Sequence, residues 1–210
     1  NGSSACLVDA TLDGIRVGDA PKMLGNEGSH ACYVWFENCE VPADSIVGGQ
    51  EGRGLKAALR GINHARLHVA ATCVGQAIRL ITEMTEYASK REQFGKRIGE
   101  FGQIAAMLAD SRAEMAAGRA LCLDCSKQFD AGDQIPFIDI ASAKLFCSEM
   151  VSRVADRAVQ VMGGLGYMED LSDVPRLFRD VRLFRIFEGA SQVQQGNIAR
   201  SMMKDNESLS

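Results

Sequence analysis

Residues 54–87 read GLKAALRGINHARLHVAATCVGQAIRLITEMTEY and mark the point at which the pattern of the chain changes. Apolar side chains recur there at steps of three and four residues, the period of an amphipathic α-helix. The stretch therefore predicts one long helix, and a single arginine, Arg66, falls on its apolar stripe. The stripe consists of Leu55, Leu59, Ile62, Arg66, Val69, Cys73, Ala77, Leu80, Met84 and Tyr87.

Two further stripes of the same period follow. Gly163-Gly164 ends the second of them, and shorter helices are expected near 174–183 and 191–202. Long helices joined by short links predict a mainly α fold, an antiparallel four-helix-type bundle spanning residues 51–210. The first of these stripes is Ile104, Leu108, Ser111, Met115, Gly118, Cys122, Cys125 and Phe129; the second, after Pro136 in the first helical turn, is Ile140, Ala143, Cys147, Val151, Val154, Ala158 and Val161.

Residues 1–50 have a different character, with many glycines and short β-type runs at 5–8, 14–17 and 30–36. The segment 38–44, which contains Pro42, then breaks the strand pattern. Two or three strands without partners do not make a stable sheet. Residues 1–50 are therefore expected to be the end of an incomplete β domain.

Composition excludes several classes of protein. Of the 210 residues, 46% are hydrophobic and 24% are charged, which is typical of a globular chain rather than a disordered one. The formal net charge of −4 argues against sequence-independent binding of nucleic acid. No apolar run approaches the ~18 residues that a membrane helix needs. The N-terminal Asn-Gly-Ser-Ser-Ala has no basic region before an apolar run, so no signal peptide is expected.

Seven cysteines, an odd number, argue against a complete disulfide framework. Buried, reduced thiols in a reducing compartment are the expected state. Cys122-x-x-Cys125 could alternatively be half of a zinc site or a redox pair, but no second pair or histidine cluster completes it. Both of these cysteines fall on an apolar stripe, which favours buried thiols.

Two other patterns also allow a structural and a functional interpretation. His64 and His68 have a spacing that can chelate an ion, yet both fall beside the stripe, which favours solvated or partly packed imidazoles. Gly163-Gly164-Leu165-Gly166 resembles a phosphate-binding loop but follows a helix rather than a strand. It therefore predicts a helix end and a tight turn, not a dinucleotide fingerprint.

Arg66 and Glu188 are the strongest candidates for chemistry. A guanidinium on an apolar stripe must be paired or must face a cavity, so Arg66 is either part of a structural ion pair or a ligand-binding group. Glu188 lies among bulky apolar residues and a glycine. It is either a glutamate at a helix start, favoured by the helix dipole, or a base among apolar walls.

Four motifs follow one another along the helical part of the chain: Arg91-Glu-Gln-Phe94-Gly95-Lys-Arg-Ile98, Gln160-Val-Met-Gly163-Gly164-Leu-Gly166-Tyr167, Arg179-Asp180-x-Arg182 and Ile186-Phe187-Glu188-Gly189-x-Ser-Gln192. In this order they resemble the motifs of the acyl-CoA dehydrogenase family, and residues 36–43 resemble the end of the middle β domain of that family. The resemblance therefore implies a C-terminal fragment: the end of the middle β domain and the C-terminal helical domain.

The reaction that this resemblance implies is α,β-dehydrogenation of an acyl-CoA thioester, a step of fatty acid metabolism. Glu188 matches the base that removes the α-proton while hydride passes from the β-carbon to FAD. A second branch of the family carries its glutamate on the first long helix, where this chain has Ala65. The resemblance further implies an electron-transfer flavoprotein as partner, a homo-oligomer (tetramer or dimer), and a cytoplasmic or, in a eukaryote, a mitochondrial matrix location.

The family pattern also implies binding residues. Asn63, Arg66 and Gly189 match substrate positions. Two positions depart from the pattern, since Ala190 stands where threonine is common and Gly102 where glutamine often contacts FAD. Arg91 and Phe94 match residues that reach FAD across a subunit interface. The full set that matches FAD-binding positions is Arg91, Phe94, Ile98, Gly102, Gln160, Val161, Met162, Gly163, Gly164, Ala190, Ser191 and Gln192.

Two alternatives stay open at this point. An acyl-CoA oxidase would use the same base and let oxygen reoxidise the flavin. A fragment of this length could instead be a non-catalytic helical domain for oligomerisation or binding. The sequence does not define the length of the acyl chain.

Overall fold

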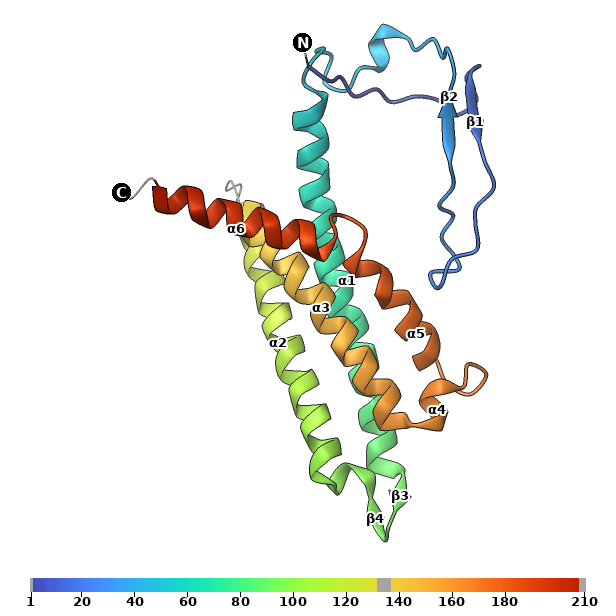
Figure 1. Cartoon of the computed structure of the whole chain (residues 1–210), viewed down its shortest axis with the longest axis vertical. Coiled ribbons are helices and arrows are strands. Elements are labelled where there is room, and N and C mark those ends of the chain that lie inside the picture. Colours follow the sequence, from blue (N-terminus) through green and yellow to red (C-terminus); the bar gives the residue numbers. More distant parts are fainter. Residues whose placement is uncertain (1, 132–136, 208–210) are drawn as a thin grey trace. The chain divides into compact units, whose positions relative to one another are not determined.

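The computed structural model describes residues 2–131 and 137–207 (Figure 1). The chain divides into two compact units between His64 and Ala65, a point inside the first long helix. The part up to His64 is called the strand unit below, and the part from Ala65 onward the helical unit.

The strand unit contains two short antiparallel strands, β1 (Ile15–Val17) and β2 (Val34–Phe36), and the 3₁₀ turn η1 (Ala43–Ser45). The strands predicted at 14–17 and 30–36 are therefore present but shorter. The strand predicted at 5–8 is wrong, because that segment makes only an isolated bridge between Cys6 and Ile46.

Large apolar side chains of the strand unit are exposed. Leu7 is 81% exposed, Tyr33 70% and Phe36 60%. Some of this surface is organised locally, since the Arg16 guanidinium stacks 3.7 Å from the centre of the Trp35 ring. The described residues of this unit nevertheless enclose no hydrophobic core of their own.

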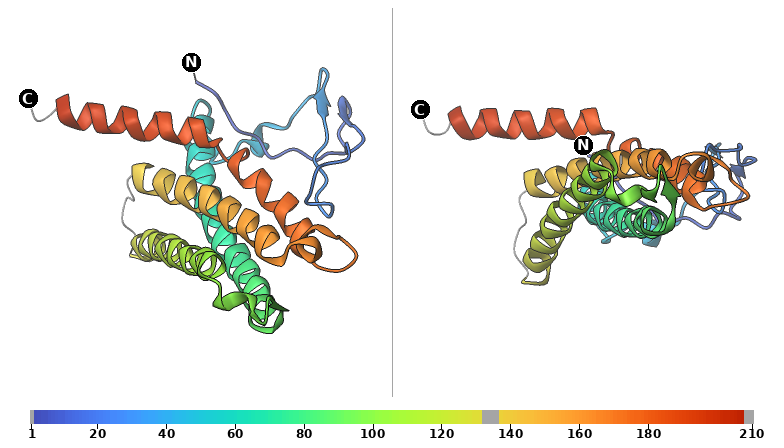
Figure 2. Two further views of the ribbon diagram at one scale, coloured as in Figure 1. Left: turned by 60° about the horizontal axis from the view of Figure 1, so that its bottom comes forward. Right: turned by 90° about the horizontal axis from the view of Figure 1, so that it is seen from below.

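The predicted mainly α fold is confirmed. The long helices are α1 (Gly54–Lys90), α2 (Gly102–Asp130) and α3 (Phe137–Met162), followed by the shorter α4 (Gly164–Tyr167), α5 (Val174–Val181) and α6 (Ser191–Glu207). Within the helical unit α1, α2 and α3 alternate in direction, whereas α6 crosses α3 at a steep angle (Figure 2). Pro136, expected in the first turn of α3, lies outside the described residues.

A small hairpin between α1 and α2 has no counterpart in the predicted elements. Its strands are β3 (Glu92–Gln93) and β4 (Lys96–Arg97), and the 3₁₀ turn η2 (Ile98–Glu100) leads into α2. The connecting residues Phe94 and Gly95 both have positive φ, 53° and 78°. A two-residue loop with two left-handed residues matches the twist of an antiparallel pair, so it reverses the chain tightly.

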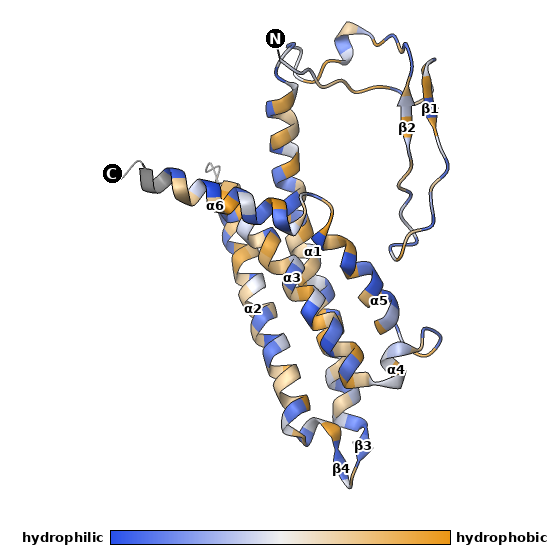
Figure 3. Ribbon diagram, in the orientation of Figure 1, coloured by the Kyte–Doolittle hydropathy of each residue, from blue (hydrophilic) through white to orange (hydrophobic). Residues whose placement is uncertain are grey.

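Helix α3 is the centre of the core. All seven residues of its predicted stripe are buried, and the five buried residues of α2 all lie on the stripe predicted for that helix. Figure 3 shows hydrophobic and hydrophilic residues alternating along these helices. Gly118 lets α2 approach α3 closely, because a Cβ there would lie 3.1 Å from Cys147 Sγ and 3.2 Å from Met150 Cε.

The glycines after α3 end that helix, as predicted. Gly163 has a φ of 58°, which is unfavourable for other residues, and α4 then folds back. A Cβ on Gly166 would lie 2.9 Å from the carbonyl oxygen of Val159, so the return is close. The connection from α5 to α6 passes through the 3₁₀ turn η3 (Arg182–Arg185).

The cysteines are buried only in the helical unit. Cys73, Cys122, Cys125 and Cys147 are buried there, as expected. The expectation is wrong for Cys6 and Cys32, which are exposed because the strand unit encloses no core. Among the described residues no three His, Cys, Asp or Glu side chains gather as a metal site would require, and no helix there is both long and apolar enough to cross a membrane.

Candidate active site

Glu188 lies in an unusual backbone conformation between η3 and α6. Its φ is 51°, and that of Gly189 is 89°. A left-handed glutamate costs roughly 1–2 kcal/mol, so it persists only where its surroundings fix it. The interpretation as a helix-start glutamate is wrong, because α6 begins three residues later, at Ser191. Residues 186–190 are called the Glu188 turn below.

Three side-chain donors converge on the two carbonyl groups of this turn. The Arg66 Nε donates to the Glu188 oxygen at 3.2 Å, and the Lys144 Nζ donates to the Gly189 oxygen at 2.7 Å. The Gln194 amide donates to both oxygens, at 3.2 and 3.3 Å. The donors come from α1, α3 and α6, so the turn is held by three helices.

Arg66 was expected to be part of a structural ion pair or a ligand-binding group, and in the structure it is buried with a hydrogen bond to a backbone oxygen. It is 7% exposed and lies 5.1 Å from the centre of the Phe137 ring. Burial lowers the pKa of its guanidinium, while the nearby charge of Glu188 acts in the opposite direction. Arg66 therefore contributes both a backbone hydrogen bond and a positive charge next to Glu188.

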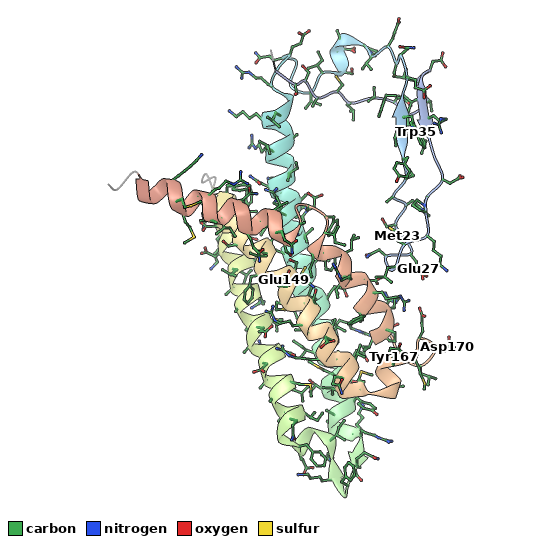
Figure 4. All side chains as sticks on the ribbon, viewed as in Figure 1. Met23, Glu27, Trp35, Glu149, Tyr167 and Asp170 are labelled. Atoms are coloured by element: carbon green, nitrogen blue, oxygen red, sulfur yellow. The ribbon has the colours of Figure 1, made fainter. Side chains whose placement is uncertain are left out.

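The ends of the Glu188 turn are held by one carboxylate on α3. Glu149 accepts hydrogen bonds from Arg185 Nε at 2.8 Å and from Ser191 Oγ at 2.6 Å, before and after the turn. Figure 4 labels Glu149 among the helices. Burial by itself would raise the pKa of Glu149, but these two hydrogen bonds and the arginine charges outweigh it and lower that pKa. Glu149 is thus a charged anchor for both ends.

Two aromatic rings precede Glu188 in the chain. The rings of Phe184 and Phe187 are stacked with centroids 5.7 Å apart, and Phe184 is buried. Glu188 itself is half-buried. A carboxylate beside apolar groups and partly shielded from water can exchange a proton with a ligand held against it.

A pocket of about 380 Å³ lies at the other end of α3. Phe94 is 94% exposed at its rim and meets Phe101 edge-on with centroids 6.2 Å apart. Seven residues predicted to bind FAD line it: Arg91, Phe94, Ile98, Val161, Met162, Gly163 and Gly164. The same pocket is also lined by Tyr87, Gln93, Phe101 and Ile104, which are not in the predicted FAD-binding set.

The chemistry of this pocket fits the nucleotide half of FAD. Aromatic rings offer faces for a planar base, and Arg91 offers a guanidinium for a diphosphate. A Cβ built on Gly163 or Gly164 would meet no atom within 4 Å, so the backbone there is open to a ligand. These residues could hold such a cofactor.

The remaining predicted residues are distributed as follows. Ala190 is the last residue of the Glu188 turn, and Ser191 and Gln192 open α6; none of the three lines the pocket. Gln160 lies on α3, and Gly102 opens α2, but neither lines the pocket. Glu149 contacts Ser191, and Met162 lines the pocket. The rise of α3 between these two residues is about 20 Å, which separates segment 190–192 from the pocket.

Positions on α1 complete the set. Asn63 belongs to the strand unit and is half-buried. His64 and His68 are exposed, as their places beside the stripe predict. Ala65, the position that could have carried an alternative base, has a side chain without an ionisable group.

Lys144 and Gln194 are among the residues at this site that sequence reasoning missed. Both are fully buried. Lys144 follows Ala143 on the apolar face of α3, so a lone cation on an apolar stripe was the available signal, the same one that singled out Arg66. No comparable signal marks Gln194.

Comparison with known proteins agrees with these features. Residues 52–203 match the family model described as acyl-CoA dehydrogenase, C-terminal domain. The probable acyl-CoA dehydrogenase FadE25 of Mycobacterium tuberculosis is 35% identical over 205 residues, which are 97% of this chain and 52% of that protein. The very long-chain specific acyl-CoA dehydrogenase of Mus musculus is 35% identical over 190 residues, 90% of this chain and 29% of that protein.

Solved structures give the same answer for the fold. Butyryl-CoA dehydrogenase from Megasphaera elsdenii superposes with a TM-score of 0.89 at 31% identity, covering 95% of this chain and 51% of that one. The chain thus spans about half the length, or less, of the relatives that it matches. The match over most of the chain, together with the placement of the four motifs, leads to one conclusion: the chain belongs to the acyl-CoA dehydrogenase family and corresponds to its C-terminal domain with a preceding β segment.

Proposed function

We propose that the full-length protein that contains this chain catalyses the FAD-dependent α,β-dehydrogenation of an acyl-CoA thioester, with Glu188 as the base. One observation carries the proposal: the carboxylate of a family motif projects from a left-handed turn that three buried side chains hold. A glutamate with only a surface role would need no such support, because a right-handed conformation is less costly for it.

In the proposed reaction, the residues of this chain remove the α-proton of the thioester. The α C–H of a thioester is a weak acid, so the carboxylate must be in contact with it, away from water. The stacked Phe184 and Phe187 supply the apolar wall, and the turn aims the carboxylate. FAD, when bound, supplies the acceptor for the hydride from the β-carbon. Asn63, Arg66 and Gly189 are proposed to contact the substrate.

The two groups of cofactor residues suggest an oligomer. The pocket with Arg91 and Phe94 and the segment 190–192 beside the base lie about 20 Å apart along α3. We propose that the segment beside the base serves the FAD of its own subunit, with Gln160 and Gly102 at the margin of the pocket. The pocket would then receive the adenosine end of a neighbour's FAD in a homodimer or homotetramer.

The substrate is proposed only as a class. The names of the relatives range from butyryl-CoA to very long-chain acyl-CoA dehydrogenases, so they support an acyl-CoA thioester without defining its chain length. An electron-transfer flavoprotein is the proposed acceptor of the electrons. The proposed location is the cytoplasm, or the mitochondrial matrix in a eukaryote, and the proposed domain limits are 1–50 and 51–210.

The test is an anaerobic titration of the full-length, FAD-loaded protein with a medium-chain acyl-CoA, followed by flavin absorbance. We expect bleaching in the unaltered protein and its loss in Glu188→Gln. The exposed Glu86 provides the matched control, since Glu86→Gln should bleach normally. Bleaching that survives Glu188→Gln would show that another residue is the base.

A second step separates the two redox classes. After bleaching, the reduced protein is mixed with either an electron-transfer flavoprotein or dioxygen. Rapid reoxidation by the flavoprotein alone supports the dehydrogenase, whereas rapid reoxidation by dioxygen would identify an oxidase. Absence of bleaching in the unaltered, FAD-loaded protein with acyl-CoA thioesters of any length would contradict the proposed reaction.

A further inference from the structure

Lys144 is a buried cation near the beginning of α3. Its side chain is fully buried on α3, among residues of the apolar core. Burying an ammonium group costs several kcal/mol unless partners compensate for the lost water. The sequence places a lysine here although the surrounding face of α3 is apolar, which points to a specific partner rather than to packing.

That partner is the backbone of the Glu188 turn. Lys144 Nζ donates to the Gly189 oxygen at 2.7 Å, the shortest of the hydrogen bonds that side chains make to this turn. A hydrogen bond from a charged donor is roughly twice as strong as a neutral one. Gln194 also reaches the Gly189 oxygen, but at 3.3 Å and without charge. Lys144 is therefore the main ligand of this carbonyl group.

The charged and titratable groups that affect the pKa of Lys144 lie on α1, on α3 and in the Glu188 turn. Burial lowers the pKa of its ammonium group, and the Arg66 charge on α1 acts in the same direction. The Cys73 thiol on α1, Glu149 on α3 and Glu188 in the turn act in the opposite direction. The lysine thus lies inside a balanced set of charges that includes the proposed base.

We propose that Lys144 is a positioning residue: by holding the Gly189 carbonyl it keeps Glu188 in its left-handed conformation and so aims the carboxylate. The inference rests on the proposed function in taking Glu188 as the base, but it adds a residue that acts through the backbone and not on substrate. It follows from the strain in the turn, because a left-handed glutamate relaxes to a commoner conformation when its support is removed.

The other two donors do not replace Lys144. Arg66 donates to the Glu188 oxygen, one residue earlier in the turn. Gln194 divides one amide group between both oxygens, and within the described residues its own Oε1 has no hydrogen-bond partner, so its amide is not fixed from the other side. Loss of Lys144 would leave the Gly189 carbonyl with one long, neutral hydrogen bond.

The experiment compares Lys144→Met with a matched control, Lys127→Met, in the full-length, FAD-loaded protein. Methionine keeps the length and apolar body of the side chain but removes the donor and the charge. Lys127 is exposed near the end of α2 and contacts neither site. Three properties are measured: the limiting rate of anaerobic flavin reduction, the dissociation constant of the acyl-CoA, and the geometry of the turn in a crystal structure.

We expect the reduction rate of Lys144→Met to fall about a hundredfold, as a displacement of about 1 Å at a reacting group can cause. The dissociation constant of the acyl-CoA should stay close to that of the unaltered protein, because Lys144 does not touch substrate. The crystal structure should show Glu188 at negative φ or the Gly189 carbonyl displaced. The control should match the unaltered protein in all three respects.

Two outcomes would overturn the inference: a Glu188 turn with unchanged geometry in Lys144→Met, or a displaced turn with an unchanged reduction rate. If that variant does not fold, Lys144→Gln, which keeps a neutral donor on a shorter side chain, is judged by the same criteria. If the unaltered protein does not bleach, the proposed reaction fails, and the geometry of the turn alone then decides whether Lys144 holds it.

Discussion

Gly189 has both a left-handed backbone conformation and side-chain donors too close to leave room for a Cβ atom. Its φ of 89° is suited to glycine, and a Cβ there would lie 2.1 Å from Gln194 Nε2 and 3.4 Å from the nearest guanidinium nitrogen of Arg66. The amide could move aside, since it is the end of a flexible side chain, but it would then lose its hydrogen bonds to the turn. Glycine is therefore required by the backbone and by the donors together.

We predict that Gly189→Ala lowers stability by roughly 1–3 kcal/mol and slows flavin reduction, because left-handed strain is added and Gln194 is displaced. Thermal unfolding and anaerobic reduction of the full-length protein measure the two effects. Gly75→Ala is the control: Gly75 lies in α1 with no atom within 4 Å of its Cβ position, so alanine should leave stability unchanged or raise it by up to ~1 kcal/mol. A Gly189→Ala protein as stable as Gly75→Ala would contradict the prediction.

Individual residues also show how far the sequence could be interpreted. The place of Arg66 on an apolar stripe indicated a buried cation with a partner, but the partner is 122 positions away and is a backbone oxygen. No local pattern encodes such a bond. Lys144 carried the same signal one turn after Ile140 and could have been identified by the same reasoning.

At the scale of elements, two ion pairs join α2 and α3 beside their packed apolar faces. Glu114 accepts from Arg153 Nε at 2.9 Å and from Arg157 at 2.9 Å. Burial would raise the pKa of Glu114, but the two hydrogen bonds and the two charges outweigh it, and the pKa is lowered. The folded state therefore favours the ionised carboxylate.

We predict that Glu114→Gln lowers stability by about 1–2 kcal/mol at neutral pH. A carboxylate whose pKa is lowered by folding stabilises the protein above its ordinary value of 4.5, and this contribution is lost as the pH falls through the folded-state pKa. The difference in melting temperature between the two proteins should therefore shrink as the pH falls below 4.5. A difference that stays constant over this range would show that packing, not charge, accounts for the loss.

Whether a helix or strand could be predicted depends on whether its sequence pattern is long and periodic or short and local. The stripes of α2 and α3 gave the buried faces correctly because long periodic segments bury one continuous face. The β3–β4 hairpin could not be predicted from its turn, since Phe94-Gly95 is not among the usual two-residue turn sequences. The segment at 5–8 has the composition of a strand, but in the described structure it has a partner only at Cys6.

For the whole chain, burial follows the division into two units. The apolar stripe of α1 begins at Leu55, yet Leu55 is 62% exposed and Leu59 is 47% exposed, while the stripe is buried from Arg66 to Met84. Periodicity predicts which face of a helix is apolar. It does not predict where along the helix that face is covered, because the cover comes from distant segments.

The same division predicts the reactivity of the seven thiols. The four cysteines of the helical unit lie in the core, so a reagent has little access to them. Burial also raises the pKa of Cys73 to about 12, so little of that thiol is ionised at neutral pH. We expect Cys73, Cys122, Cys125 and Cys147 to resist a thiol reagent in the native full-length protein and to react once it is unfolded. Peptide mapping after timed labelling measures each site separately.

The exposed Cys6 and Cys32 serve as internal references for reagent activity in that experiment, if the rest of the full-length protein leaves them accessible. Cys122 decides between the two interpretations of the Cys122-x-x-Cys125 pair. It lies 3.7 Å from Cys147, sulfur to sulfur, and faces the core rather than a ligand. Rapid native labelling of Cys122, or metal released together with it, would show a reactive or metal-binding pair; protection until unfolding shows a thiol that acts as a small apolar side chain.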